Sequence, residues 1–82
     1  AKYYILGLTN RANSYTIVGD NESALELYNM SLPIVTEQYE KNQAKYKRIY
    51  RSCLENLISI YIIKNDFQNS ISLEEILKNL SD

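Results

Sequence analysis

The sequence has no histidine and little of several other residues: its 82 positions include two glycines, one proline and one cysteine. Without histidine, the chain lacks the commonest general base and the commonest metal ligand of proteins. It also has no glycine-rich loop that would hold a phosphate group. We therefore expect that the protein is not an enzyme, that it has no catalytic residue, and that it uses neither a metal ion nor a cofactor.

The single cysteine rules out a framework of internal disulfide bonds and is typical of a protein from a reducing compartment. No apolar run approaches the roughly 20 residues that span a bilayer, and the run at residues 60–63 is only four residues long. The first residues do not resemble a signal peptide. These features predict a cytoplasmic location and no contact with a membrane.

The sequence has no large excess of charge of either sign: it contains nine basic and ten acidic side chains, and its net charge is −1. A protein that grips a phosphate backbone needs an electropositive face, so we expect no direct nucleic-acid contact from this segment. One basic cluster is present, and we interpret it as the solvated face of a helix. It consists of Lys45, Lys47, Arg48 and Arg51.

Hydrophobic residues make up 45% and charged residues 23% of the chain, which are values typical of a folded protein. The scarcity of glycine and proline leaves few turn residues for a fold of many strands, so an all-α fold is predicted. The chain, residues 1–82, is long enough for a single domain. It opens in the middle of a helical pattern and without methionine, so we expect a fragment of a longer protein. A complete small domain is the alternative.

Apolar spacing predicts four helices. In residues 2–18, side chains recur at steps of three and four residues and would share one buried face. They are Tyr4, Leu8, Ala12, Tyr15 and Val18. Gly19 and Asp20 follow as a left-handed helix end and a helix N-cap. The second helix starts near Asn21 and carries its own apolar stripe to Tyr39, with Pro33 inside it. Proline in a helix predicts a kink or a break, and the continued stripe favours the kink.

The polar residues 40–43 separate this first hairpin, about 2–39, from a second hairpin at about 44–80. The third helix, about 44–64, has a broad apolar stripe that includes Cys53, and we interpret Cys53 as a buried, inert thiol. Asn65 and Asp66 repeat the turn of Gly19 and Asp20, and the fourth helix follows at about 67–80. Tyr3, Tyr39 and Tyr46 lie off or at the edge of the stripes and are candidates for an interface.

Two helical hairpins in sequence resemble tetratricopeptide (TPR) repeats. In the first hairpin, small residues fall where two helices must cross closely, with aromatic residues beside them. The positions that carry this resemblance are Leu8, Ala12, Tyr15, Gly19, Ala24, Tyr28 and Ser31. The second hairpin matches by pattern through Leu54, Leu57 and Tyr61. Gly19 and Asn65 are 46 residues apart, whereas the standard period is about 34 residues.

The long period resembles the TPR domains of cytoplasmic transcriptional regulators from Gram-positive bacteria, which follow a helix-turn-helix domain. The resemblance implies a regulatory segment that senses a peptide or forms a homodimer. It also implies a groove lined by the first helix of each hairpin, where asparagine amides would hold an extended peptide. The residues that the resemblance to TPR repeats places there are Asn10, Asn13, Ser52, Asn56 and Ser59.

Two alternatives stay open at this point. The five polar residues fit equally well on the exposed side of amphipathic helices, without any ligand. The chain as a whole also fits a structural scaffold that associates with itself, because a pair of repeats leaves apolar end faces uncovered. A peptide or protein partner, or a second copy of the chain, is expected in either case.

Overall fold

The computed structural model describes residues 2–80, which form four α-helices and no β-strand. The helices are α1 (Lys2–Ile17), α2 (Asn21–Lys41), α3 (Gln43–Ile63) and α4 (Phe67–Lys78). The all-α fold predicted from the sequence is confirmed, and each helix starts and ends within two residues of its predicted bounds. Residues 1, 81 and 82, at the ends of the predicted domain, lie outside the described residues.

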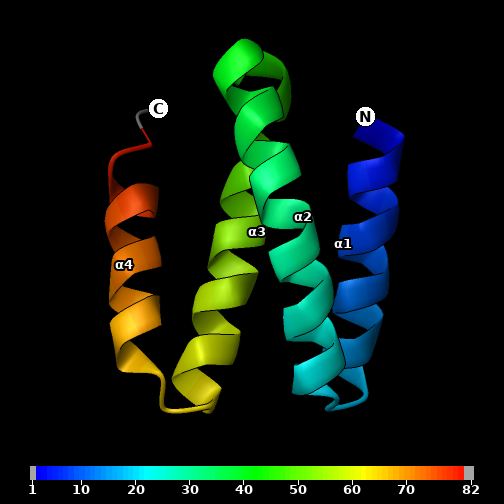
Figure 1. The fold of residues 1–82 in the computed structure, drawn as a ribbon, viewed down its shortest axis with the longest axis vertical. Coiled ribbons are helices and arrows are strands. Elements are labelled where there is room, and N and C mark those ends of the chain that lie inside the picture. Colours follow the sequence, from blue (N-terminus) through cyan, green and yellow to red (C-terminus); the bar gives the residue numbers. More distant parts are fainter. Residues whose placement is uncertain (1, 81–82) are drawn as a thin grey trace.

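The helices stand side by side in chain order, and each runs antiparallel to the next (Figure 1). Each helix packs mainly against its neighbours in the sequence, so α2 lies between α1 and α3, and α3 lies between α2 and α4. The two hairpin turns lie at one end of the helices, at the bottom of Figure 1, and the α2–α3 connection lies at the opposite end, at the top. As a result, the central helices are covered on two sides and the outer helices on one.

The two hairpin turns have the same backbone design. Gly19 has a φ of 84° and Asn65 has a φ of 60°, which are left-handed conformations suited to glycine and tolerated by asparagine. In each turn the following aspartate, Asp20 or Asp66, donates its backbone N–H over 2.8 Å to a carbonyl five residues earlier. This bond closes the end of the preceding helix, so the predicted repetition of the turn is confirmed.

The same two aspartates cap the helices that follow. One oxygen of Asp20 accepts a hydrogen bond from the Ser23 backbone N–H at 3.1 Å, and the other accepts from the Ser23 hydroxyl at 2.8 Å. Asp66 accepts in the same way from the backbone N–H of Asn69 at 3.4 Å and from its amide at 2.7 Å. Each cap satisfies an N–H group that has no partner inside the helix.

The connection between the hairpins is shorter than the sequence indicated. In place of a polar separation over residues 40–43, α2 continues to Lys41 and α3 begins at Gln43. Asn42 alone breaks the helix, because it ends one and begins the next. Its backbone N–H donates to the Gln38 carbonyl at 2.9 Å, and its side chain accepts from the Lys45 N–H at 3.2 Å. Two helices can therefore meet across one residue.

Proline 33 does not end the second helix. Helix α2 runs without a break from Asn21 to Lys41, and Pro33 lies on its exposed side. The alternative of a break at this position is therefore wrong. The apolar stripe continues past Pro33 to the fully buried Val35, and the packing of that stripe outweighs the loss of one backbone hydrogen bond.

The core lies along the contacts between neighbouring helices. The small residues Ala12 and Ala24 have no exposed surface, as expected where α1 and α2 cross closely. Helix α3 contributes the largest share of buried side chains, because it has a neighbour on each side. Its buried residues are Tyr46, Tyr50, Cys53, Leu54, Leu57, Ile58 and Ile60.

We predict that Ala24→Leu lowers the free energy of unfolding by about 1–3 kcal/mol, because the larger side chain has no room at this fully buried position. Urea unfolding followed by circular dichroism would measure the change. The matched control is Ala44→Leu at an exposed position of α3, which should leave stability nearly unchanged. Equal effects of the two substitutions would contradict the close packing of α1 and α2.

The Asp20 cap also predicts a dependence of stability on pH. The hydrogen bonds from the Ser23 hydroxyl and then from its backbone N–H lower the pKa of Asp20 below its ordinary value. The carboxylate therefore stabilises the fold above its unfolded-state pKa, and this contribution is lost as pH falls through the lower folded-state pKa. Asp20→Asn still accepts the cap hydrogen bond but does not titrate. We expect the melting temperature of the wild type to fall more than that of Asp20→Asn on acidification below about pH 4. If the melting temperatures of the two proteins fall equally with pH, the Asp20 cap does not contribute to the pH dependence of stability.

Candidate interaction surfaces

Polar groups line the contact between α2 and α3. The Ser31 hydroxyl and the Cys53 thiol are both buried and lie 3.7 Å apart. The same hydroxyl donates to the Tyr28 carbonyl at 2.9 Å. Among the described residues, no buried side-chain nitrogen or oxygen lacks a hydrogen-bond partner. The polar atoms of this contact are therefore part of the packed core.

Two tyrosine hydroxyls complete the α2–α3 contact. The Asn29 amide of α2 donates to the Tyr61 hydroxyl of α3 at 3.5 Å. Burial raises the pKa of the Tyr28 phenol, a negative Cys53 would raise it further, and a hydrogen bond with the Asn56 side chain acts in the opposite direction. Asn56 is thus joined to α2, which no spacing pattern in the sequence could reveal.

The thiol of Cys53 is only 1% exposed, so the prediction of a buried cysteine is confirmed. Burial raises the pKa of this thiol, and the hydrogen bond with Ser31 offsets the increase only in part. Because the thiolate is the reactive form, a raised pKa together with burial makes the group a poor nucleophile.

The predicted groove residues lie on two helices that α2 separates. Asn10 and Asn13 are exposed on α1, and Ser52 and Ser59 are exposed on α3. Asn56 is half-buried because it bonds to Tyr28. The structure therefore places all five residues at or near the surface without gathering them in one recess, and their role in binding stays a prediction.

These residues nevertheless occupy equivalent places in the two hairpins. A shift of 46 residues superimposes the Gly19 turn on the Asn65 turn, as the matching hydrogen bonds show. The same shift relates Asn10 of α1 to Asn56 of α3, and Asn13 to Ser59. The first helix of each hairpin therefore presents polar groups in the same register.

One side of α1 is exposed although it carries apolar side chains. Tyr4, Tyr15 and Val18 were predicted to share the buried face of Leu8 and Ala12, and this prediction is wrong. Tyr4 is 58% exposed and Val18 is 76% exposed. The reason is that, among the described helices, α1 packs mainly against α2, which covers only part of the apolar stripe. We call the exposed part the α1 face, and it consists of Tyr4, Gly7, Arg11, Ser14, Tyr15 and Val18.

Two shallow hollows follow one another along the α1 face. One is lined by Arg11, Ser14, Tyr15 and Val18, and the other extends from Arg11 to Tyr3 and Tyr4. Arg11 lies where the two hollows meet. Apolar hollows with a single central charge are typical of a surface that receives side chains from a partner.

The three tyrosines proposed for an interface have different surroundings. Tyr3 is 88% exposed at the start of α1, next to the α1 face. Tyr46 is buried, so its assignment to an interface is wrong. Tyr39 is half-buried, and its ring centroid lies 4.8 Å from that of Tyr50, so its ring is already in contact with another. The rings of Tyr39 and Tyr50 hold α2 and α3 together near Asn42.

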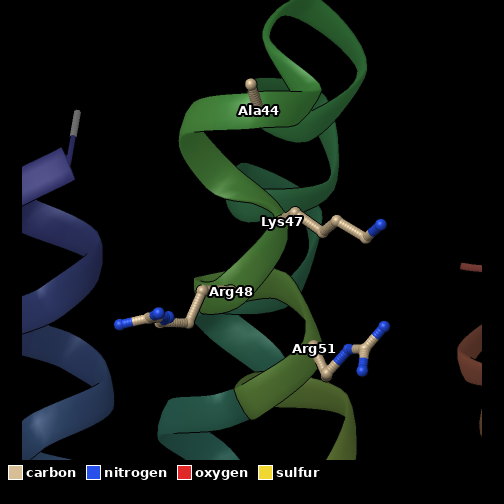
Figure 2. A pocket seen from close by; sticks show the side chains of 4 residues that line it. All are labelled: Ala44, Lys47, Arg48 and Arg51. Carbon is tan, nitrogen blue, oxygen red and sulfur yellow. The ribbon is translucent and has the colours of Figure 1, made fainter. Parts of the chain in front are cut away.

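The basic residues of α3 surround a shallow hollow near the N-terminal end of the helix. Ala44, Lys47, Arg48 and Arg51 line it. Figure 2 shows Lys47 and Arg51 pointing to one side of the helix and Arg48 to the other. Lys47 and Arg51 also interact with other groups of the chain. The charges are therefore spread out and partly engaged, and they do not converge on one point.

No group of three or more histidine, cysteine, aspartate or glutamate side chains among residues 2–80 is placed to hold a metal ion. Within the same residues, no helix is both long and apolar enough to cross a membrane. Comparisons with protein-family models, with curated proteins and with solved structures found no match. The candidate surfaces are therefore defined by the geometry of this chain alone.

We predict that Cys53 in the native protein reacts with iodoacetamide more than about tenfold more slowly than in the urea-unfolded chain, because its thiol is buried and its pKa is raised. Mass spectrometry of the alkylated protein over time would measure both rates. A control peptide with residues 50–56 gives the rate of the unprotected thiol. Equal rates in the native protein and the peptide would contradict the packing of α3 against α2.

Proposed function

We propose that the chain is a TPR-like segment that binds a peptide or a protein, as the regulatory part of a cytoplasmic bacterial transcriptional regulator. The observation that supports this proposal best is the repetition of one hairpin design at an interval of 46 residues, with the same turn and the same aspartate cap. Repeated hairpins present repeated surfaces, which suit extended ligands.

The asparagine side chains give this surface its chemistry. Each amide can donate to and accept from the backbone of an extended peptide, without selecting its sequence. Asn10 and Asn13 of α1 are exposed and available to a ligand. Asn56 of α3 is held by Tyr28, so its orientation is set before a ligand arrives and less side-chain entropy is lost on binding.

Within this proposal, the segment itself does not contact DNA. Its net charge is −1, and the basic residues of α3 are spread over two sides of the helix (Figure 2). Contact with DNA would be made by another part of the regulator, and the segment would report the bound peptide through its helices. No cofactor or metal ion is required for such a role.

A second function is favoured by a separate observation, the exposed apolar side chains on both outer helices. Tyr4 and Val18 of α1 and Phe67 and Ile71 of α4 are all more than half exposed. Exposed apolar residues in contiguous patches mark surfaces that bind other proteins. The chain would then be a scaffold whose role is self-association.

A library of random heptapeptides displayed on phage, selected against the immobilised chain, would test peptide binding. We expect selected peptides to bind the Asn13→Ala, Ser59→Ala variant at least about tenfold more weakly in calorimetry, because two hydrogen bonds are lost. Both residues are exposed, so the variant should fold normally.

Gln68→Ala removes an exposed amide from α4 and serves as the matched control. It should bind the selected peptides as tightly as the wild type does. Unchanged affinity of the double variant would place the peptide elsewhere on the molecule. Failure to select any peptide would argue against peptide binding and leave self-association as the function.

A further inference from the structure

The contact between α2 and α3 joins the two hairpins, and it is made by a specific set of residue pairs. Asn29 bonds to Tyr61, Tyr28 bonds to Asn56 and faces Cys53, Ser31 bonds to Cys53, and Glu22 forms an ion pair with Lys64. Tyr39 also packs against Tyr50. The side of α3 that faces α2 therefore consists of Tyr50, Cys53, Asn56, Tyr61 and Lys64, together with Leu57, which lies one helical turn from both Cys53 and Tyr61.

A shift of 46 residues identifies the side of α1 that is equivalent to this side of α3, and that side of α1 lies at the surface. Subtracting 46 from the α3 positions gives Tyr4, Gly7, Asn10, Tyr15, Val18 and Arg11. All six are exposed, and all but Asn10 belong to the α1 face. The surface that α3 uses to bind α2 thus has a counterpart on α1 that the described chain leaves uncovered.

Helix α4 has the complementary surface. The side of α2 that faces α3 carries Glu22, Tyr28, Asn29 and Ser31, with Leu25 one turn from Tyr28 and Asn29. The shift of 46 residues relates Ser31 to the half-buried Leu77, and it relates the other four positions to Gln68, Glu74, Glu75 and Ile71, which are exposed on α4. We call these four residues, with the neighbouring exposed Phe67, the α4 face.

We propose that copies of this chain associate head to tail, with the α4 face of one copy packed against the α1 face of the next as α2 packs against α3. This proposal rests on the second function, self-association. It does not require the peptide groove. The two faces belong to α1 and α4, which stand at opposite ends of the row of helices (Figure 1), so both can be occupied at once.

Two of the positions that differ between the internal contact and the proposed one differ in a complementary way. Arg11 stands in the place of Leu57, and Glu74 stands in the place of Tyr28. Because Tyr28 faces Cys53 and Asn56 of α3, Glu74 would face Gly7 and Asn10 of the next copy, within reach of the Arg11 guanidinium. A leucine and a tyrosine are thus replaced by two opposite charges, which can form a charge-assisted hydrogen bond.

The proposed contact also has a counterpart of the Asn29–Tyr61 pair, with a different donor and acceptor. The Asn29–Tyr61 hydrogen bond of the internal contact becomes Glu75 opposite Tyr15, where the Tyr15 hydroxyl can donate a hydrogen bond to the Glu75 carboxylate. Ile71, in the place of Leu25, would lie beside Tyr15 and Val18 and bury the apolar part of the α1 face. A Cβ atom added at Gly7 would have no neighbour within 4 Å, so this position leaves space for the incoming Glu74.

The charges also explain why a second copy is the occupant. The α1 face carries a positive charge and the α4 face carries two negative ones, and both occur in the same chain. Two copies that met through α1 faces alone would bring two Arg11 side chains together, and two α4 faces would bring four carboxylates together. Like charges in a contact are costly, so unlike faces meet. Such a contact is heterologous, and it continues from copy to copy unless the rotation closes a ring.

Sedimentation velocity between about 1 μM and about 1 mM chain at low salt, where surface charges are least screened, would test this proposal. We expect the weight-average sedimentation coefficient of the wild type to keep rising past the dimer value. Arg11→Glu and Glu74→Arg should each weaken association at least about tenfold. An equimolar mixture of the two variants, or the double variant, should restore it, because opposite charges then meet again.

Glu55→Arg is the matched control, because it reverses an exposed charge on α3 outside both faces. It should associate as the wild type does. Circular dichroism of all variants should match that of the wild type, since each changed residue is exposed. Three results would overturn the head-to-tail contact and leave self-association in place. They are unchanged association of Glu74→Arg, no recovery of association in the mixture of variants, and a wild type that stops at the dimer. A wild type that remains monomeric near 1 mM would overturn both, with the peptide-binding proposal unaffected.

Discussion

An α-helix in a single row can bury its apolar surface only where a neighbouring helix covers it, and most features of this structure follow from that constraint. Helix α3 has a neighbour on each side and buries seven residues, whereas α4 has one neighbour and buries only Ser70. The polar pair of Ser31 and Cys53 is tolerated inside because each group has the other as a partner. The outer edges of the row remain apolar and open.

Because the two hairpin turns have the same design, the two hairpins present equivalent surfaces. A left-handed residue followed by a capping aspartate sets how each pair of helices meets, and the same device occurs at Gly19 and at Asn65. Because the turns match, each position on α1 has a counterpart on α3. That correspondence supports both the exposed amides proposed for ligand binding and the contact proposed between copies. The two roles meet at Asn10, which both the proposed groove and the proposed contact between copies include, whereas Asn13 belongs to the groove alone.

Charge decides what an otherwise general helix contact selects. The internal α2–α3 contact combines apolar side chains with hydrogen bonds and the Glu22–Lys64 ion pair. It is made once per chain, where covalent linkage already ensures the right partner. A contact between copies has no such linkage, and opposite charges at Arg11 and Glu74 would supply the discrimination instead. For the proposed contact, a substitution on one face is therefore informative only together with its counterpart on the other.

Periodicity and local chemistry were enough for the helices, both hairpin turns and the buried Cys53, because these depend on spacing and on residues within one turn. Local sequence could not show that Asn42 alone joins two helices, since a polar run looks the same whether it is coil or helix end. Nor could it show that Asn56 bonds to Tyr28 or that Tyr15 and Val18 stay exposed. Those outcomes depend on which helices become neighbours and how much of each stripe they cover, and only the tertiary structure decides that.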